Sequence, residues 1–432
     1  MADANGSVVI KGGRVVDPSG ERDADVLIAD GRVAEVGASL KGDRVLDATG
    51  CLVAPGLVDL HVHLREPGDE DAETIDTGAR AAALGGFTAI VAMPNTQPPH
   101  DEPSVVASVL AAGKRSLCDV HAAGCITEKR AGEALAPMGE LHALGVRIFT
   151  DDGACVADAG VMRRALEYAR ALPDAVVAQH AEDPALADGG HMHEGEWSSR
   201  LGIAGRPGIA ESIVVSRDCA LAEATGGRVH FLHLSTAAAV DLVRDAKARG
   251  LAVTAEAAPH HFTLTDAQCA TFDPLYKVHP PLRSDADVAA VKAGLADGTI
   301  DAIATDHAPH ATEQKERPFE EAPPGMLGLE TALALTITEL VETGVLSLQD
   351  ALGLLSWRPA AIAGLGEHGR PLAPGEPANV CVIDPELRWE VDAHRLASKA
   401  RNTPYAGRTL TGRVRHTVLR GMPVVIDGEA CR

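Results

Sequence analysis

The sequence has no apolar run of membrane-spanning length, no CxxC pair among its eight cysteines, and fewer basic than acidic residues. A membrane helix needs about 20 consecutive apolar residues, so no integral membrane segment is expected. Scattered cysteines in a chain of 432 residues indicate reduced thiols rather than a disulfide framework. The polar first six residues lack the basic and apolar parts of a signal peptide, so we expect a cytoplasmic protein.

The shortage of positive charge also limits the partners of the chain. Lysine and arginine number 39 against 61 aspartates and glutamates, which gives a formal net charge of −22. Such a balance excludes a general affinity for nucleic acid or for anionic membranes. If the substrate is an anion, the binding site must supply its own local positive charge.

The pattern of strands and helices changes twice along the chain. Short strands separated by turn residues occupy residues 7–55 and return after residue 366, and Asp30-Gly31 between two strands is typical of a hairpin. Between these ends, eight short β-branched segments alternate with segments of helical period, which predicts a (β/α)8 TIM-type barrel. The eight segments are 57–64, 87–95, 119–126, 145–153, 175–182, 228–236, 251–262 and 301–310.

Two domains follow from this pattern. We expect the barrel over residues 56–365 and a small β-sandwich domain built from both chain ends, residues 1–55 plus 366–432. One long polar and proline-rich connection, residues 310–328, follows the eighth predicted strand. After a barrel strand such a connection is a candidate active-site loop.

The clearest chemical signal is His61-Val62-His63 at the end of the first barrel strand. Side chains at positions i and i+2 of a strand point to the same side, so both imidazoles can reach one ion. Further candidates end the fourth, fifth, sixth and eighth strands: Asp151-Asp152, His180, His233 and Asp306. Because the carboxyl ends of barrel strands meet at one mouth, the set predicts a metal centre.

Imidazole and carboxylate ligands suit zinc, and six of them exceed the needs of one tetrahedral ion with an open position. We therefore expect two ions bridged by a carboxylate and a hydroxide. Zinc lowers the pKa of bound water to about 7, which supplies a nucleophile at neutral pH. Asp306 would hold an ion and also pass the nucleophile's proton to a leaving nitrogen.

Arg65 lies two residues beyond His63 and is a candidate for binding a substrate carboxylate through paired, charged hydrogen bonds. The structural alternative is a salt bridge to the neighbouring Glu66. Asn95 closes the second strand and His310 follows the eighth, at the same mouth. Several other histidines lack a partner at ligand spacing and are expected to be structural or exposed: His121, His142, His191, His193 and His230. His260 and His261 stay outside the predicted metal set.

Seven motifs of the chain closely resemble the bacterial dihydroorotase family. They are HVHLREPG (61–68), MPNTQP (93–98), TDDG (150–153), HLST (233–236), EAAPHHF (256–262), TDHAPH (305–310) and GLET (328–331). The resemblance implies a zinc enzyme of pyrimidine biosynthesis that reversibly cyclises N-carbamoyl-L-aspartate to L-dihydroorotate. It implies one zinc on His61, His63 and Asp306, a second on His180 and His233, and Asp152 as the bridge.

The same resemblance implies the substrate contacts. Arg65, Asn95 and His310 would hold the substrate, and the backbone at Pro324-Gly325 would close over the ring. The family usually has asparagine where this sequence has His279, within YKVHPPLR (276–283). A neutral imidazole offers one donor and one acceptor, so His279 can partly replace an amide in holding the ring.

Two alternatives to this function differ in testable ways. A hydantoinase- or allantoinase-like cyclic-amide hydrolase is disfavoured because many such relatives bridge their metals with a carboxylated lysine, and residues 145–153 contain none. A catalytically silent homologue that serves aspartate carbamoyltransferase as a subunit is disfavoured because all six ligand positions are filled. We expect a homodimer without nucleic-acid or membrane partners, and leave an association with aspartate carbamoyltransferase open.

Overall fold

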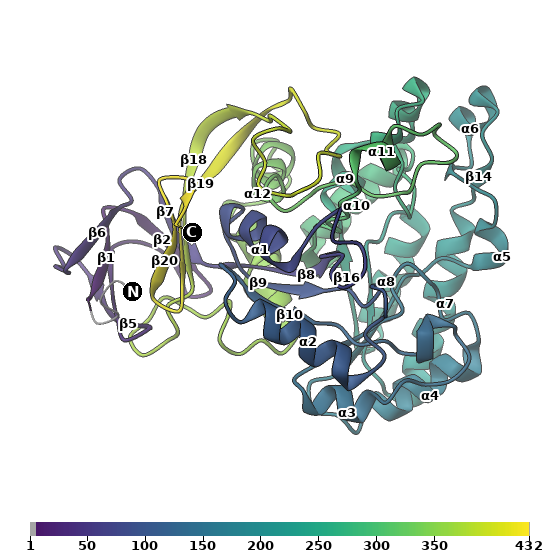
Figure 1. Cartoon of the computed structure of the whole chain (residues 1–432), viewed down its shortest axis with the longest axis horizontal. Helices are drawn as coiled ribbons and strands as arrows, with labels where there is room; N and C mark the ends of the chain where they lie inside the picture. The colour runs from purple at the N-terminus through teal and green to yellow at the C-terminus, as the bar shows by residue number, and fades with distance from the viewer. Residues whose placement is uncertain (1–5, 432) are drawn as a thin grey trace.

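Eight strands of the central chain pair in parallel and close into a barrel (Figure 1). The structure is a computed structural model that describes residues 6–431, so the first five residues of the predicted polar N-terminus lie outside the described residues. Pairing between Gly124 and Phe149 joins the two runs of barrel strands, and pairing between Val62 and His307 closes the circle. The predicted (β/α)8 barrel is confirmed.

Each predicted barrel segment contains one of these strands. In chain order they are β8 (Leu57–Val62), β9 (Phe87–Ala92), β10 (Asp119–Ala122), β11 (Ile148–Phe149), β12 (Val176–Gln179), β15 (Val229–Phe231), β16 (Val253–Ala257) and β17 (Ala302–Ile303). Every residue of β8 and of β9 is buried. Parallel strands that are covered on both faces have nearly continuous apolar sequences rich in β-branched residues. This explains the composition of β8 and β9.

Helices follow the strands and cover the outside of the barrel. The main ones are α1 (Ile75–Leu84), α2 (Pro103–Gly113), α3 (Met138–Ala143), α4 (Ala159–Ala169), α7 (Ile209–Thr225), α8 (Ala237–Ala248), α10 (Asp285–Asp297) and α13 (Leu348–Leu355). Thr74 caps α1 and Ser284 caps α10, each through a capping box that satisfies free N–H groups of the first turn. None of the helices in residues 6–431 has the length and apolar character required to cross a bilayer.

Both chain ends build the second domain, on the left of Figure 1. One sheet has the order β5-β4-β1-β6 and the other β21-β20-β19-β18-β7-β2-β3. The N-terminal strands are β1 (Val8–Lys11), β2 (Arg14–Asp17), β3 (Gly20–Asp23), β4 (Asp25–Ala29), β5 (Arg32–Gly37), β6 (Arg44–Asp47) and β7 (Leu52–Pro55). The C-terminal strands are β18 (Val380–Glu390), β19 (Thr409–Leu419), β20 (Met422–Ile426) and β21 (Glu429–Ala430).

Pairing across the chain ends makes this domain one unit. Strand β7 pairs with β2 on one side and with β18 on the other. Side chains of both ends, among them Ile10, Val53 and Val380, share one buried apolar cluster. The predicted β-sandwich and the hairpin at Asp30-Gly31, between β4 and β5, are confirmed. The exact domain limits, 55/56 and 365/366, stay predictions.

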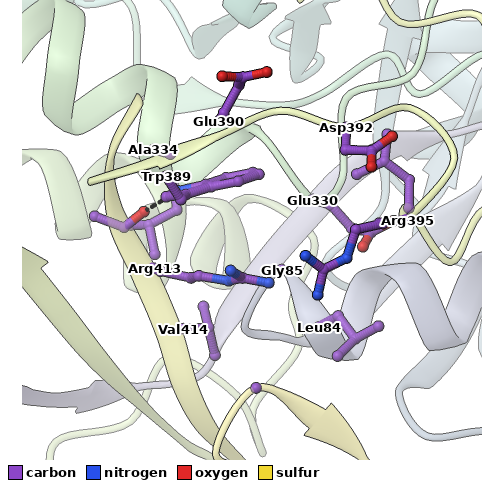
Figure 2. A pocket seen from close by; sticks show the side chains of 14 residues that line it. Leu84, Gly85, Glu330, Ala334, Trp389, Glu390, Asp392, Arg395, Arg413 and Val414 are labelled. Carbon is purple, nitrogen blue, oxygen red and sulfur yellow. Dashed lines mark hydrogen bonds between the residues drawn. The ribbon is translucent and has the colours of Figure 1, made fainter. Parts of the chain in front are cut away.

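The β18–β19 hairpin also contacts the barrel through α12 (Ala332–Thr336). A cavity of about 160 Å³ lies there, and Figure 2 shows the guanidinium group of Arg413 near the ring of Trp389. The guanidinium carbon lies 5.1 Å from the ring centroid, and Trp389 Nε1 donates to Gly412 O at 2.9 Å. None of the predicted site residues lines this cavity.

The 310–328 connection returns over the mouth of the barrel and contains α11 (Thr312–Lys315). Lys315 is buried, and its Nζ donates to Pro323 O at 2.9 Å and to Gly325 O at 3.1 Å. Gly325 N in turn donates to Lys277 O at 2.8 Å. Hydrogen bonds from the buried Lys315 therefore hold the connection in place at Pro323 and Gly325, on either side of Pro324.

Candidate functional site

The six predicted ligand residues lie together at the carboxyl ends of the barrel strands. All six are buried: His61, His63, Asp152, His180, His233 and Asp306. Two groups have ligand atoms within 4.8 Å of one another and the geometry to hold a metal ion. The first group is His61, His63 and Asp306, and the second is His61, Asp152 and His233.

Around His61 and His63 the imidazoles face two carboxylates. His63 Nε2 lies 3.0 Å and His61 Nε2 lies 3.5 Å from Asp306 Oδ1. The same two nitrogens lie 3.5 Å and 3.3 Å from Asp152 Oδ2. Two imidazole nitrogens and two carboxylate oxygens thus converge on one small volume.

The other oxygen of Asp152 faces a second pair of imidazoles. His180 Nδ1 and His233 Nε2 each lie 3.6 Å from Asp152 Oδ1, and they lie 3.0 Å from each other. Asp152 therefore presents one oxygen to each pair of histidines. This is the arrangement that a carboxylate bridge between two ions requires.

The residues present fit a cationic centre. His61 Nε2 and Asp152 Oδ1 are buried and have no hydrogen-bond partner, although buried polar atoms are normally paired. Burial raises the pKa of Asp152, but His61, His180 and His233 outweigh it and hold the pKa well below its ordinary value. An ionised carboxylate among imidazole nitrogens is a borderline ligand set that suits zinc and related divalent ions.

The neighbouring Asp151 faces away from this centre. Its Oδ1 accepts hydrogen bonds from Ile126 N at 2.8 Å and Thr127 N at 3.0 Å, and its Oδ2 accepts one from Thr127 Oγ1. These contacts tie the end of β11 to the chain that follows β10. Of the two adjacent aspartates, only Asp152 is turned toward the histidines.

Comparison with known proteins gives the family. A model of the dihydro-orotase-like family matches residues 50–239. A dihydroorotase of Pelotomaculum thermopropionicum is 51% identical over 97% of this chain and 99% of its own length. One of Streptomyces coelicolor is 50% identical over 98% of this chain and 99% of its own length. The chain belongs to the dihydroorotase family.

The fold is also that of a solved hydantoinase. The L-hydantoinase (dihydropyrimidinase) of Arthrobacter aurescens superposes with a TM-score of 0.88 at 28% identity, over 98% of this chain and 97% of its own. The sequence identity to the dihydroorotases is much higher over a similar length. This chain is therefore a dihydroorotase-family enzyme on a fold that hydantoinases share.

Two of the histidines in this dihydroorotase site have orienting partners. His61 Nδ1 donates to Glu256 Oε1 at 2.9 Å, and Glu256 Oε2 accepts from His230 Nε2 at 3.1 Å. His63 Nδ1 donates to Asn95 Oδ1 at 2.9 Å. Such contacts fix the tautomer so that Nε2 carries the lone pair. Sequence reasoning missed Glu256, although a glutamate inside the apolar strand β16 was an available signal.

A cavity of about 300 Å³ opens beside the histidines. It contains all six residues that the sequence predicted for substrate binding: Arg65, Asn95, His279, His310, Pro324 and Gly325. It is also lined by Glu182 and Arg206, which sequence reasoning did not single out. The cavity therefore joins the metal-binding groups to charged and polar side chains from distant parts of the chain.

Arg65 does not form the expected alternative contact with Glu66. Its Nε donates to Pro309 O at 3.0 Å, and its Nη2 lies 3.4 Å from His310 Nε2. Glu66 instead accepts a hydrogen bond from Ile75 N at 2.8 Å. Burial lowers the pKa of the Arg65 guanidinium, and within residues 6–431 no carboxylate forms an ion pair with it. Its charge is available to an anion in the cavity.

The two histidines of the cavity that were predicted for substrate binding, His279 and His310, both have lowered pKa values. Burial, with Arg65 next, lowers the pKa of His310 to about 3, and burial with Arg206 next lowers that of His279 to about 3. His310 Nε2 donates to Pro324 O at 2.8 Å. His279 Nε2 is buried and has no partner.

The two histidines left out of the metal set lie in α9 (Pro259–Thr263) and are both buried. His261 Nε2 donates to Pro280 O at 3.0 Å, which is a structural contact. His260 Nε2 lies 4.0 Å from Asp306 Oδ2 and has no hydrogen-bond partner. His260 therefore borders the centre without belonging to either metal-binding group.

Proposed function

We propose that this chain catalyses the reversible cyclisation of N-carbamoyl-L-aspartate to L-dihydroorotate. The observation that carries the proposal is Asp152, whose two oxygens face two separate pairs of buried imidazoles. Membership of the dihydroorotase family, at about half sequence identity, supports the substrate.

We further propose that two zinc ions occupy the centre. His61, His63 and Asp306 would hold one ion, His180 and His233 the other, and Asp152 would bridge them. The ions would supply Lewis acidity toward a carbonyl oxygen and lower the pKa of a water molecule. The orienting contacts to His61 and His63 support this assignment because they direct Nε2 of each ring into the centre.

Asp306 is the proposed acid and base. Its Oδ1 faces His61 and His63, which leaves Oδ2 for proton exchange with the substrate. In the hydrolytic direction Asp306 takes a proton from the attacking water and gives it to the departing ring nitrogen. In the biosynthetic direction the same carboxylate receives a proton from the carbamoyl nitrogen.

The cavity residues would hold the substrate by charge and by shape. Arg65, whose guanidinium forms no ion pair with a carboxylate of residues 6–431, would bind a substrate carboxylate together with His310 and Asn95. Asn95 would combine this contact with its hydrogen bond to His63. His279 and the backbone at Pro324-Gly325 would contact the ring.

Turnover and metal content test the proposal together. Protein purified with zinc should contain two ions per chain and convert dihydroorotate, and a chelator should remove the activity until zinc is restored. Because the fold is shared with a hydantoinase, the same protein is assayed with hydantoin and allantoin. Turnover of those compounds without turnover of dihydroorotate would overturn the proposal.

Adjacent aspartates offer a matched pair of variants. Asp152→Asn should lose metal from both positions because it removes the shared carboxylate. Asp151→Asn should keep its metal and lower the melting temperature, since Asp151 only accepts hydrogen bonds from Ile126 and Thr127. The opposite pattern would move the bridge to Asp151.

The proposal includes a cytoplasmic homodimer. Eight free cysteines support a reducing compartment. The dimer, and any association with aspartate carbamoyltransferase, stay predictions. Light scattering of the purified chain, alone and mixed with that enzyme, tests both.

A further inference from the structure

Two charged residues of the cavity have no part in the metal groups or in the predicted substrate contacts. Arg206 lies on the short strand β14 (Gly205–Arg206), which pairs with β13 (Met192–His193). Its Nη1 donates to Glu182 Oε2, and its Nε donates to Gly190 O at 2.8 Å. Arg206 thereby fixes the carboxylate of Glu182 at the cavity wall.

The second oxygen of Glu182 is left without a partner. Glu182 is only 5% exposed, and its Oε1 is buried and accepts no hydrogen bond. His279 Nε2, in the same cavity lining, is also buried and unpaired. Glu182 Oε1 can only accept a hydrogen bond, and His279 Nε2 can donate one. A ligand group that carries both N–H donors and a carbonyl oxygen would therefore pair with both atoms.

A purely structural role for Glu182 leaves this oxygen unexplained. Glu182 Oε2 lies 3.7 Å from His180 Nε2, so the carboxylate can help to orient that imidazole. That contact and the contact from Arg206 both use Oε2. Oε1 stays free in either case.

We propose that Glu182 is a specificity-determining residue whose Oε1 accepts a hydrogen bond from an N–H of the substrate's ureido group. Arg206 is then a positioning residue, and His279 Nε2 donates to the ureido oxygen. A carboxylate at this wall also repels the two carboxylates of the substrate and so keeps them away from the position of the ureido group. This inference rests on the proposed function.

The test measures the preference for a ureido group. Dissociation constants are measured by calorimetry with zinc-loaded protein for N-carbamoyl-L-aspartate and for succinate, which has two carboxylates and no ureido group. The ratio of the two constants cancels effects that act on both dianions. In Glu182→Met the preference for N-carbamoyl-L-aspartate should fall roughly 10-fold or more, because a charged hydrogen bond is lost.

Further variants separate this contact from folding and from metal binding. Glu182→Gln keeps a neutral acceptor of the same shape and should show a smaller fall. Arg206→Met should lower the preference and Arg206→Lys should restore part of it. The control is Glu196→Met, on the exposed face of α6 (Glu196–Leu201), which should leave the ratio unchanged.

The outcomes are distinct. Unchanged preference in both Glu182 variants, with weaker zinc binding, would overturn the inference and assign Glu182 to the orientation of His180. An unmodified enzyme that neither binds N-carbamoyl-L-aspartate nor converts dihydroorotate would instead overturn the proposed function.

Discussion

The buried Lys315 predicts an unusual dependence of stability on pH. Its side chain is 7% exposed, and burial, with the charge of Lys277 next, lowers its pKa from the ordinary 10.5 to about 7. That difference corresponds to roughly 5 kcal/mol against folding when the amine is charged. Below pH 7 the folded and unfolded states are both protonated, so the penalty is present in full.

As the pH rises from 7 to 10.5, the folded chain releases the proton while the unfolded chain keeps it. The stability contributed by this group therefore rises over that window. Lys315→Met removes the titration and leaves Pro323 O without its Lys315 donor, at a cost of about 1–3 kcal/mol. The variant should equal or exceed the natural protein in stability at pH 7 and lose that advantage at higher pH.

Urea unfolding at several pH values checks this. The free-energy difference between the two proteins should shift by roughly 3 kcal/mol in favour of the natural protein between pH 7 and pH 9.5. Lys114→Met, at an exposed position after α2, should show no such shift. A difference that stays constant over this range would refute the reasoning.

Three further substitutions test the site. Asp306→Asn should abolish turnover in both directions because an amide cannot accept the transferred proton, and activity near that of the natural enzyme would reject the assignment. His279→Asn should preserve or improve turnover of dihydroorotate, whereas a large loss would show that the histidine has its own role. In Gly325→Ala the new Cβ would lie 2.7 Å from Ala308 Cβ and 2.9 Å from His310 Nε2, at a φ of +134°. KM for dihydroorotate should then rise roughly 10-fold or more with the metal content intact, and an unchanged KM would contradict this placement of the loop.

The sequence was sufficient for the barrel because each strand is a short β-branched run between turns. Alternation also placed His61 and His63 on one side of their strand. It could not choose between Asp151 and Asp152, since the two are adjacent, lie just beyond the end of β11 and are both buried. The choice depends on Ile126 and Thr127, which reach Asp151 from the chain that follows β10.

The contacts of Glu256 and Arg206 could not be predicted either, because they too join residues that are far apart in the sequence. Glu256 is recognisable as a charged residue in an apolar strand, but its contact with His61 spans 195 residues of sequence. Arg206 lies in the segment of short elements between β12 and α7. No periodic pattern there predicts where its side chain points. Local patterns identify which side chains end at the mouth, and only tertiary packing shows which of them face one another.

The position of β7 between β2 and β18 means that the sheet is completed only late in synthesis. A ribosome releases β18 only after the entire barrel has been made, so the early strands wait with one side of β7 unpaired. A message cut short before codon 380 would leave that edge open permanently, and open edges recruit strands from other molecules. Loss of β18 would therefore appear as aggregation through β7, more than 300 residues earlier in the chain.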